Sequence, residues 1–510
     1  MRLLVQLIGE ARPGGAPPIS FVVDGRPVEV PDDGASLLEV LRDRVGVRSP
    51  KDGCSPQGQC GCCTVWVDGS PRVACVTPTR RVAGREVTTL DGIDPIVRQR
   101  WVQAFVNAGA SQCGFCTPGI LMRLAGLEAR RAGDGPLDER SVGTALAAHL
   151  CRCTGWRSIF DAALGTSSTA PHAATRDLAN AARRAELEGG SPQLVGADVV
   201  LGHGGFADDT APAGALVAVP DGAGGWVVAD TLHEARAKAG KVQGRNSTVA
   251  LRHPLELPPG DFVVTLRTTW VEPGYLEPDA SWCEPGGEPA TPLANGGAFG
   301  GKRHSPVAAA ARRLAGEYGR AVRVVLARED VVRAGPKRPP VAAGVRADGT
   351  GIVRVARTPD SGELGSWRAA LERAAPGLVV EEVAVPGPPV SADVRAAGWA
   401  EGAVLRAVWL AVIAGASGRG PEVTIASPEG GRATATMAAD GAVQVSVSAG
   451  DPLDEVTLRS YVLGATHQAL GWVRREGIAV DEAGAVLDLT VRSFGILPAR
   501  DMPAVEIVVD

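Results

Sequence analysis

Nine of the ten cysteines in this 510-residue chain lie between Cys54 and Cys153, and Cys283 alone falls outside that stretch. Clustered thiols can form disulfides, bind zinc or bind iron–sulfur clusters. Disulfide frameworks are typical of small secreted domains, whereas this chain is long and its N-terminus shows no secretory signal. The pattern therefore predicts metal binding in a reducing compartment, the cytoplasm, with zinc and iron–sulfur as the two candidates.

The first group of cysteines has the spacing C-x5-C-x2-C-x11-C and comprises Cys54, Cys60, Cys63 and Cys75. Plant-type [2Fe–2S] ferredoxins use C-x4-C-x2-C and a distant fourth cysteine, so the first gap is one residue longer here. Glycines interleave with these thiols and permit the left-handed turns that aim backbone N–H groups at a cluster. Zinc sites favour paired CxxC knuckles, and only one such pair is present. The spacing favours a [2Fe–2S] cluster, with Cys62 facing away from it.

The second group has the spacing C-x2-C-x34-C-x1-C and comprises Cys113, Cys116, Cys151 and Cys153. Thr117-Pro118 has the composition of an N-cap followed by a first helical position, and a second helix is expected over residues 142–150. Both cysteine pairs would then lie at helix ends. Facing helix termini can hold four thiols around one cluster, and N-terminal dipoles favour its negative charge. Beside the first group, this pattern predicts a second cluster.

The hydrophobic pattern also predicts the elements that position the first group. Apolar and polar residues alternate over residues 21–30 around Asp24-Gly25, which predicts a β-hairpin. Leu37, Leu38 and Leu41 follow at helical spacing and predict a short helix packed on that sheet. Because aromatic residues are only 4% of the chain, alanine, valine and leucine must fill the core.

Residues 18–165 resemble the iron–sulfur part of the xanthine oxidase, or molybdenum hydroxylase, family. The segments KDGCSPQGQCGCCTV, QCGFCTPG and CRCTG are nearly identical to motifs of that family. The resemblance implies a β-grasp ferredoxin-like domain over residues 1–90 and a four-helix [2Fe–2S] domain over residues 91–165. It also implies that the first group binds the cluster nearer solvent and the second group the cluster nearer the substrate site.

Residues 194–510, after a linker at 166–193, resemble a shortened large part of the same family. The segments WVEPGYLEPDASWCEPGG, GGAFGGK and VVLAREDVV follow in the family's order. The resemblance implies an α+β chain whose last region is a truncated molybdopterin-domain-like fold. By the same resemblance, the residues that approach the pterin of the molybdenum cofactor are Gln112, Cys153, Gly297, Phe299 and Gly300.

Three parts of the family's pterin site are not found: a Gly-Gln-Gly element, a Ser-rich turn and a late Gly-Glu-Pro-Pro element that supplies a catalytic glutamate. Arg395 matches the first residue of the family's Arg-Gly-Phe-Gly turn, but the residues after it differ. Arg303 stands where relatives often have an acidic residue. A pterin pyrophosphate needs donors from several loops, and one glycine-rich loop supplies only part of them. We therefore expect no complete molybdopterin site in this chain and assign no catalytic residue.

The remaining candidate groups have two interpretations each. Glu272 and Glu277 are either an acid–base pair or a structural pair that stabilises a turn. The basic doublets at residues 302–303 and 337–338 either bind an anion or lie in solvent. His467 is expected to be a surface or satisfied core side chain, and Cys283 a small buried hydrophobe.

Composition limits the partners. The net charge of −5 shows no basic excess, which argues against nucleic acid as a partner. No run of about 18 apolar residues is present, which argues against a membrane span. The resemblance implies an oligomer that includes a flavin subunit, which would carry FAD, and a second molybdopterin-type subunit.

Together these features predict an iron–sulfur oxidoreductase that relays electrons through two [2Fe–2S] clusters. The substrate implied by the resemblance is a small N-heterocycle or aldehyde that is oxidised by hydroxylation or dehydrogenation. Two alternatives stay open. One is a molybdopterin-dependent hydroxylase with a pared-down pocket, and the other is a non-catalytic scaffold whose clusters serve folding.

Overall fold

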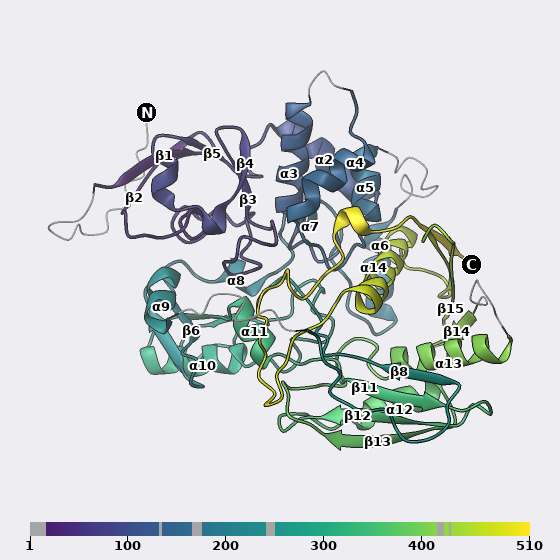
Figure 1. Cartoon of the computed structure of the whole chain (residues 1–510). Coiled ribbons are helices and arrows are strands. Elements are labelled where there is room, and N and C mark those ends of the chain that lie inside the picture. The colour runs from purple at the N-terminus through teal and green to yellow at the C-terminus, as the bar shows by residue number, and fades with distance from the viewer. Residues whose placement is uncertain (1–16, 132–134, 166–175, 241–249, 416–422, 428–429) are drawn as a thin grey trace.

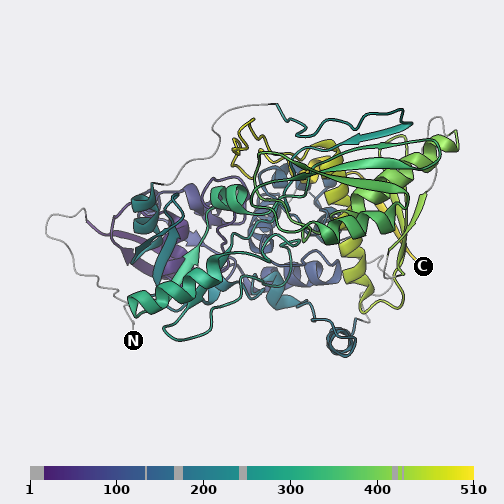
Figure 2. The ribbon, with the colours of Figure 1, turned by 90° about the horizontal axis from the view of Figure 1, so that it is seen from below.

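The structure, a computed structural model, describes residues 17–131, 135–165, 176–240, 250–415, 423–427 and 430–510. Four mixed sheets with their helices make up this part of the chain (Figure 1). The N-terminal sheet and the C-terminal strand lie at opposite ends of an elongated molecule (Figure 2). No helix among the described residues is both long and apolar enough to cross a membrane.

The first domain is a five-stranded sheet in the order β2-β1-β5-β3-β4. Its strands are β1 (Ile19–Val23), β2 (Arg26–Val30), β3 (Thr64–Val67), β4 (Ser70–Val73) and β5 (Glu86–Thr88). The hairpin predicted around Asp24-Gly25 is present, and both turn residues have positive φ (49° and 75°). A short helix, α1 (Leu37–Glu39), continues as a π-helical turn at Val40–Arg44 and buries its leucines under the sheet, as predicted.

The second domain is helical. It contains α2 (Pro95–Asn107), α3 (Thr117–Arg130), α4 (Glu139–Ala145) and α5 (Arg157–Leu164). The helix expected over residues 142–150 is shorter than predicted, because α4 ends at Ala145 in a 3-10 turn and the chain is extended at His149. Thr117 is the first residue of α3 and does not cap it; its hydroxyl bonds the Ser111 hydroxyl at 2.9 Å.

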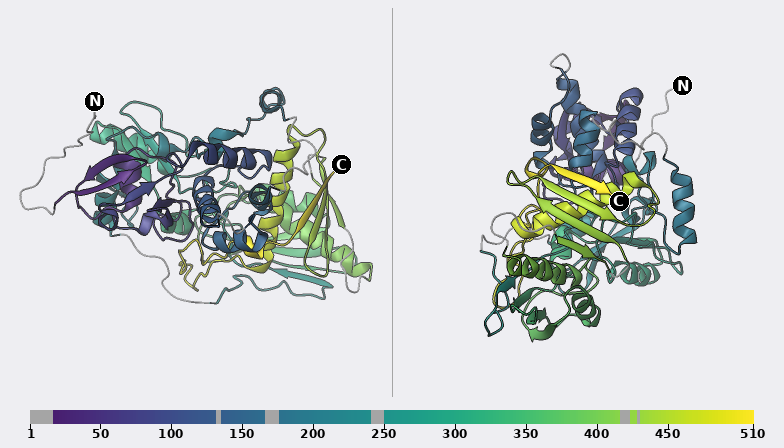
Figure 3. Two further views of the ribbon diagram at one scale, coloured as in Figure 1. Left: turned by 90° about the horizontal axis from the view of Figure 1, so that it is seen from above. Right: turned by 90° about the vertical axis from the view of Figure 1, so that its right-hand side faces the viewer.

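Part of the expected linker is helical. Residues 166–175 lie outside the described part of the chain, and α6 (Leu178–Leu187) follows them. This helix stands apart from the body of the molecule, and only Ala185 among its residues is buried (Figure 3). Its start is held by Arg176, which forms an ion pair with Asp454 at 2.6 Å.

The large part begins with a four-stranded sheet in the order β7-β6-β10-β9. Its strands are β6 (Leu216–Pro220), β7 (Trp226–Ala229), β9 (Ala280–Cys283) and β10 (Val322–Val325). Its helices are α7 (Ala197–Val200), α8 (Ala207–Thr210), α9 (Leu232–Ala239), α10 (Val307–Tyr318) and α11 (Arg328–Ala334). Every residue of the central strands β6 and β10 except Pro220 is buried, and α9 and α10 pack on this sheet.

Two further sheets complete the large part. The sheet β13-β12-β11-β8 consists of β8 (Val264–Arg267), β11 (Val341–Val345), β12 (Gly351–Arg357) and β13 (Leu378–Ala384), with α12 (Gly365–Ala374) and α13 (Trp399–Ile413) beside it. The last sheet consists of β14 (Val423–Ala426), β15 (Arg432–Met437), β16 (Val443–Ser448) and β17 (Val505–Val509), with α14 (Glu455–Arg474) beside it. One hydrophobic core runs from Ile19 to Met502 and therefore joins the iron–sulfur part to the large part.

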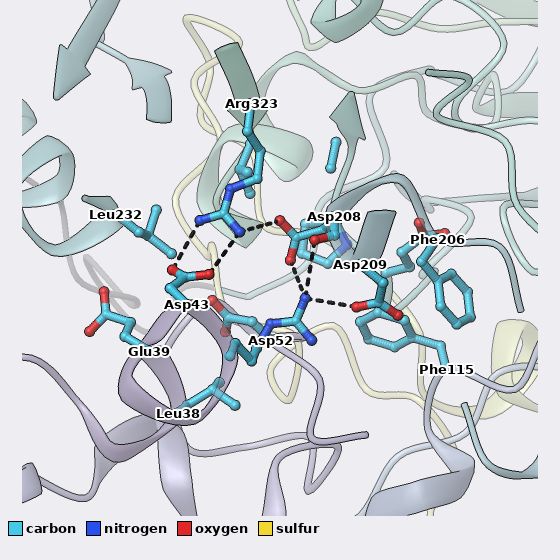
Figure 4. Close-up of a pocket in the computed structure, with 15 residues that line it drawn as sticks. Leu38, Glu39, Asp43, Asp52, Phe115, Phe206, Asp208, Asp209, Leu232 and Arg323 are labelled. Atoms are coloured by element: carbon cyan, nitrogen blue, oxygen red, sulfur yellow. Dashed lines mark hydrogen bonds and ion pairs between the residues drawn. The ribbon is translucent and has the colours of Figure 1, made fainter. Parts of the chain in front are cut away.

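Buried ion pairs also join these two parts (Figure 4). Arg42 of the first domain contacts Asp208 at 2.7 Å and Asp209 at 2.8 Å. In the opposite direction, Arg323 of β10 contacts Asp43 of the first domain at 2.9 Å and also Asp208 at 3.3 Å. Both guanidinium groups are almost completely buried around a cavity of about 30 Å³. Neither part can rotate on the other without exposing or separating these charges.

This network gives a pH-dependent contribution to stability. Burial raises the pKa of Asp208, but Arg323 and Arg42 outweigh burial and hold that pKa well below its usual range. Because the folded pKa is depressed, the ionised carboxylate stabilises the fold above about pH 4, and this contribution is lost as the pH falls further. We expect Asp208→Asn to lower the free energy of unfolding by about 3 kcal/mol at pH 7. Urea unfolding of the wild type and the variant at pH 7 and pH 3 would measure this difference in the free energy of unfolding.

A matched control is Asp68→Asn, which removes an exposed ion pair with Arg85. Exposed pairs contribute only about 0–1 kcal/mol, so this change should have little effect. The expectation is contradicted if both variants lose the same free energy of unfolding. It is also contradicted if the difference in this free energy between Asp208→Asn and the wild type is as large at pH 3 as at pH 7.

Candidate metal centres

The four thiols of the first group are buried together beside the N-terminal sheet; Cys54, Cys60, Cys63 and Cys75 are here named the first quartet. The loop between Cys54 and Cys60 turns its backbone toward sulfur. The N–H groups of Gln57 and Gln59 donate to the Cys54 sulfur at 3.3 and 3.4 Å, and the Cys75 N–H donates to the Cys63 sulfur at 3.5 Å. This is the environment that lowers the cost of negative charge on a cluster.

The sulfurs of the first quartet contact one another. Hydrogen bonds from the Cys60 and Cys75 thiols hold the pKa of Cys54 well below its ordinary value. The same contact with Cys54 raises the pKa of Cys60 well above it. The thiols of the first quartet therefore lie close enough to share protons, as side chains that converge on one site do.

The second quartet consists of Cys113, Cys116, Cys151 and Cys153, and its sulfurs meet in pairs. The Cys113 and Cys153 sulfurs are 3.6 Å apart. The Cys116 thiol bonds the Cys151 sulfur, and this contact lowers the pKa of Cys151 to about 6. Two pairs of thiols suit a binuclear cluster, in which each iron takes two cysteines. No group of three or more His, Cys, Asp or Glu side chains in the described residues converges on a single-ion site.

The backbone around the second quartet differs from the sequence-based expectation. Cys116 directly precedes α3, so one pair does lie at a helix N-terminus. No helix runs into Cys151, because the 3-10 turn that follows α4 ends at Ala148 and His149 is extended. This extended segment lets the Leu150 N–H reach the Cys60 carbonyl at 3.0 Å, a hydrogen bond that links the two quartets directly.

The region between the quartets is tightly packed. A Cβ on Gly61 would lie 2.4 Å from the His149 ring, and one on Gly119 would lie 2.3 Å from the Gly61 carbonyl. Cys62 is fully buried here, and its thiol contacts that of Cys60. The expectation that Cys62 faces away from the first quartet is therefore wrong. His149 fills the remaining space as a neutral ring, since burial lowers its pKa to about 3.

The thiols of the two quartets differ in exposure. All four sulfurs of the first quartet belong to buried residues, whereas Cys113 of the second quartet is half-buried. The first quartet approaches the surface where Val76, which is 50% exposed, follows Cys75 and packs against Gly58. The outer boundary of the first quartet is thus a thin apolar cover.

Three of the five residues expected near a pterin gather at the second quartet. Gln112 donates its side-chain amide to the Cys153 carbonyl and to the Ser460 carbonyl of α14, both at 2.9 Å. Gly297 lies directly on the sulfurs, because a Cβ there would be 3.1 Å from the Cys113 sulfur and 3.4 Å from that of Cys153. The cavity beside these residues is about 10 Å³.

The other two residues, Phe299 and Gly300, face a different loop. The Phe299 carbonyl accepts a hydrogen bond from the Arg395 N–H at 3.0 Å, and the Arg395 guanidinium lies 5.7 Å from the centre of the Phe299 ring. A Cβ on Gly300 would lie 1.8 Å from the Asp393 carbonyl oxygen. The glycine-rich loop, residues 296–301, therefore contacts both the second quartet and the segment that follows β13.

Several charged residues are buried that the sequence left open or placed in solvent. Glu277 forms an ion pair with Lys302 at 2.7 Å, and Glu272 forms one with Arg328. Burial raises the pKa of Glu277. Both glutamates are structural partners of buried cations in this fold. Lys337, expected in solvent or on an anion, is also completely buried.

Comparison with known proteins agrees with the geometry. A family model described as [2Fe-2S] binding domain matches residues 89–164. The xanthine dehydrogenase iron-sulfur-binding subunit of Escherichia coli O157:H7 is 37% identical over 155 residues, which are 30% of this chain and 94% of that protein. The nicotinate dehydrogenase small FeS subunit of Eubacterium barkeri is 36% identical over 137 residues, which are 26% of this chain and 83% of that protein. The chain belongs to the xanthine oxidase family.

The large part shares the family's fold as well. The aldehyde oxidoreductase from Desulfovibrio desulfuricans superposes with a TM-score of 0.67 at 15% identity, covering 97% of this chain and 94% of that chain. The relatives are named as dehydrogenases or oxidoreductases, so the chain is of an oxidoreductase family with a [2Fe–2S] binding domain.

The contact between Gly297 and the second quartet can be tested against its neighbour. Gly296 and Gly297 both have positive φ (85° and 83°), but a Cβ on Gly296 meets nothing within 4 Å. We expect Gly297→Ala to perturb the signal of one cluster by pressing on the Cys113 and Cys153 sulfurs, and Gly296→Ala to leave both cluster signals intact. Electron paramagnetic resonance of the reduced protein would check this. Identical spectra for the two variants would contradict the contact.

Proposed function

We propose that this chain is an iron–sulfur oxidoreductase component that relays electrons through two [2Fe–2S] clusters during oxidation of a small N-heterocyclic or aldehyde-type compound. The observation that carries the proposal is the presence of two buried thiol quartets joined by one hydrogen bond. In this proposal residues 1–90 and 91–165 are the two cluster domains, 166–193 the linker and 194–510 the shortened large part.

Each quartet would hold one cluster through its four cysteines. Bound clusters supply one-electron transfer, which none of the amino-acid side chains here supplies by itself. The residues around them exclude water and hold the sulfurs in place: backbone N–H groups on the first quartet, and on the second the Thr154 hydroxyl, 3.1 Å from the Cys151 sulfur. These contacts favour the negative charge that such clusters carry.

The Leu150–Cys60 hydrogen bond supports a direct connection between the clusters. It joins the backbone of a first-quartet ligand to the residue that precedes Cys151, so covalent bonds and a single 3.0 Å hydrogen bond span the two sites. The packing of His149 and Cys62 leaves no room for bulk water on this route. A fixed, dry connection keeps the coupling between two redox sites constant.

Substitution of single cysteines tests the ligand assignment. Cys75→Ala and Cys151→Ala should each reduce the iron content from about four to about two atoms per chain, because one binuclear cluster is lost in each variant. The two variants should lose different paramagnetic signals. Cys62→Ala and Cys283→Ala serve as matched controls and should retain both. A chain that binds zinc in place of iron, or that keeps both signals in either ligand variant, would overturn the proposal.

We propose further that this chain does not hold a molybdopterin. Small-molecule cofactor pockets are typically about 300–1,000 Å³, whereas the cavity lined by Cys113, Cys153 and Gly297 is about 10 Å³. The amide of Gln112 is already donated to Cys153 and Ser460 within the chain. The residues present at the second quartet therefore do not fit a pterin ring system.

Metal quantification on anaerobically purified protein tests the proposal that the chain holds no molybdopterin against the alternative of a molybdopterin-dependent hydroxylase. We expect iron without molybdenum, since the chain offers no space beside the second quartet. One molybdenum for every four irons would support the alternative of a hydroxylase with a pared-down pocket. Clusters that cannot be reduced reversibly would support the third possibility, a scaffold in which they serve only folding.

The proposal includes partner chains. Several relatives are named as iron–sulfur subunits of dehydrogenases. By analogy with them, the partners we propose for this chain are a second molybdopterin-type subunit, together with a flavin subunit. The exposed Val76 beside Cys75 offers an apolar contact next to the first quartet for such a partner. No disulfide joins the cysteines of the described residues, which is compatible with the reducing cytoplasm that we propose.

A further inference from the structure

A group of buried charged side chains supplies no ligand to either quartet, although one of them, Arg152, lies in the chain between Cys151 and Cys153. All six are nearly inaccessible to solvent: Arg152, Glu272, Arg328, Glu329, Lys337 and Glu476. We name them the buried charge group. Three are basic side chains and three are carboxylates, and burial lowers the pKa of Lys337 to about 7, so Lys337 carries only part of a positive charge at neutral pH. Charges at this depth are poorly screened by water and salt.

The buried charge group touches the loop that carries the first quartet. Gln57, whose backbone N–H donates to the Cys54 sulfur, also donates its side-chain amide to Glu329 at 3.1 Å. Glu329 and Arg328 are the first residues of α11, so the start of this helix abuts the Cys54–Cys60 loop. Arg328 is close enough to Cys54 for the two to interact electrostatically.

Arg328 is incompletely satisfied within the chain. It forms an ion pair with Glu272, yet no hydrogen bond reaches its Nε or Nη1 among the described residues. Burial lowers the pKa of Arg328 to about 9, so it remains protonated at neutral pH. A buried guanidinium with unused donors is costly to a fold, which calls for a role beyond packing.

We propose that Arg328 and Glu272 set the reduction potential of the first cluster through their charges, Arg328 raising it and Glu272 lowering it. The inference rests on the proposed function, because it requires a cluster in the first quartet. Reduction adds one negative charge to a [2Fe–2S] site, so a nearby buried cation stabilises the reduced form and a nearby carboxylate destabilises it. Arg328 and Glu272 act on the cluster only through the electric field at its sulfurs.

Three variants test the proposal, because each is expected to raise, lower or restore the reduction potential of the first cluster. Arg328→Met should lower the potential of the first cluster, and Glu272→Gln should raise it. The double variant should return close to the wild type, because it restores the charge balance. We expect each single change to alter the ratio of reduced to oxidised first cluster about tenfold at a fixed potential, which is about 59 mV for one electron.

The measurement is a redox titration followed by electron paramagnetic resonance, in which Cys75→Ala identifies the first-cluster signal. Arg328→Lys keeps the positive charge, so the reduction potential of its first cluster should stay close to that of the wild type. This variant keeps the test available even if Arg328→Met fails to assemble. Arg85→Met removes an exposed cation of the same domain and should shift neither potential. Steric disturbance alone would not give opposite signs for the two single variants.

Two different failures remain distinguishable. If the wild-type protein carries no reducible clusters, the proposed function is wrong. If both signals are present, but Arg328→Met and Glu272→Gln shift the first potential in the same direction or not at all, only the present inference is overturned.

Discussion

The structure depends on keeping eight sulfurs together in a dry interior where negative charge is expensive. Each quartet meets this constraint locally, through backbone N–H groups, a threonine hydroxyl and glycines that allow close approach. The contact with the Cys151 sulfur, together with burial, raises the pKa of Cys116 well above its ordinary value. The backbone N–H groups that donate to the Cys54 and Cys63 sulfurs oppose protonation, because they favour the negatively charged thiolate.

The large part of the chain covers the quartets. The C-terminal segment donates the Val491 N–H to Gln57 and the Arg492 N–H to Gln59, so residues more than 400 positions away close the first-quartet loop. α14 closes the second quartet in the same way, since a Cβ on Gly464 would lie 1.8 Å from the Cys153 carbonyl. The ion pairs of Arg42 and the continuous core fix this cover in one orientation. The large part therefore encloses both quartets and fixes the loops that carry their cysteines.

The local features could be predicted from the sequence, whereas the long-range ones could not. The Asp24-Gly25 hairpin and the two quartets follow from spacing within a few tens of residues. The end of α4 could not be placed in this way, because the extended run at Leu150 is dictated by Cys60, which lies 90 residues earlier. The same holds for Lys337: a basic doublet normally lies in solvent, and nothing in the sequence shows that Arg328 and Glu272 are packed nearby.

Two residues of the family motifs hold the second quartet in place. Gly297 contacts two sulfurs of the second quartet, where a side chain would press on them. Gln112 ties the Cys153 backbone to Ser460 and so fixes α14 over the quartet. Both residues have a complete structural role without any cofactor beyond the cluster. A motif shared with a cofactor-binding family therefore identifies the scaffold around the sulfurs, and the volume left beside them decides whether a second cofactor can bind.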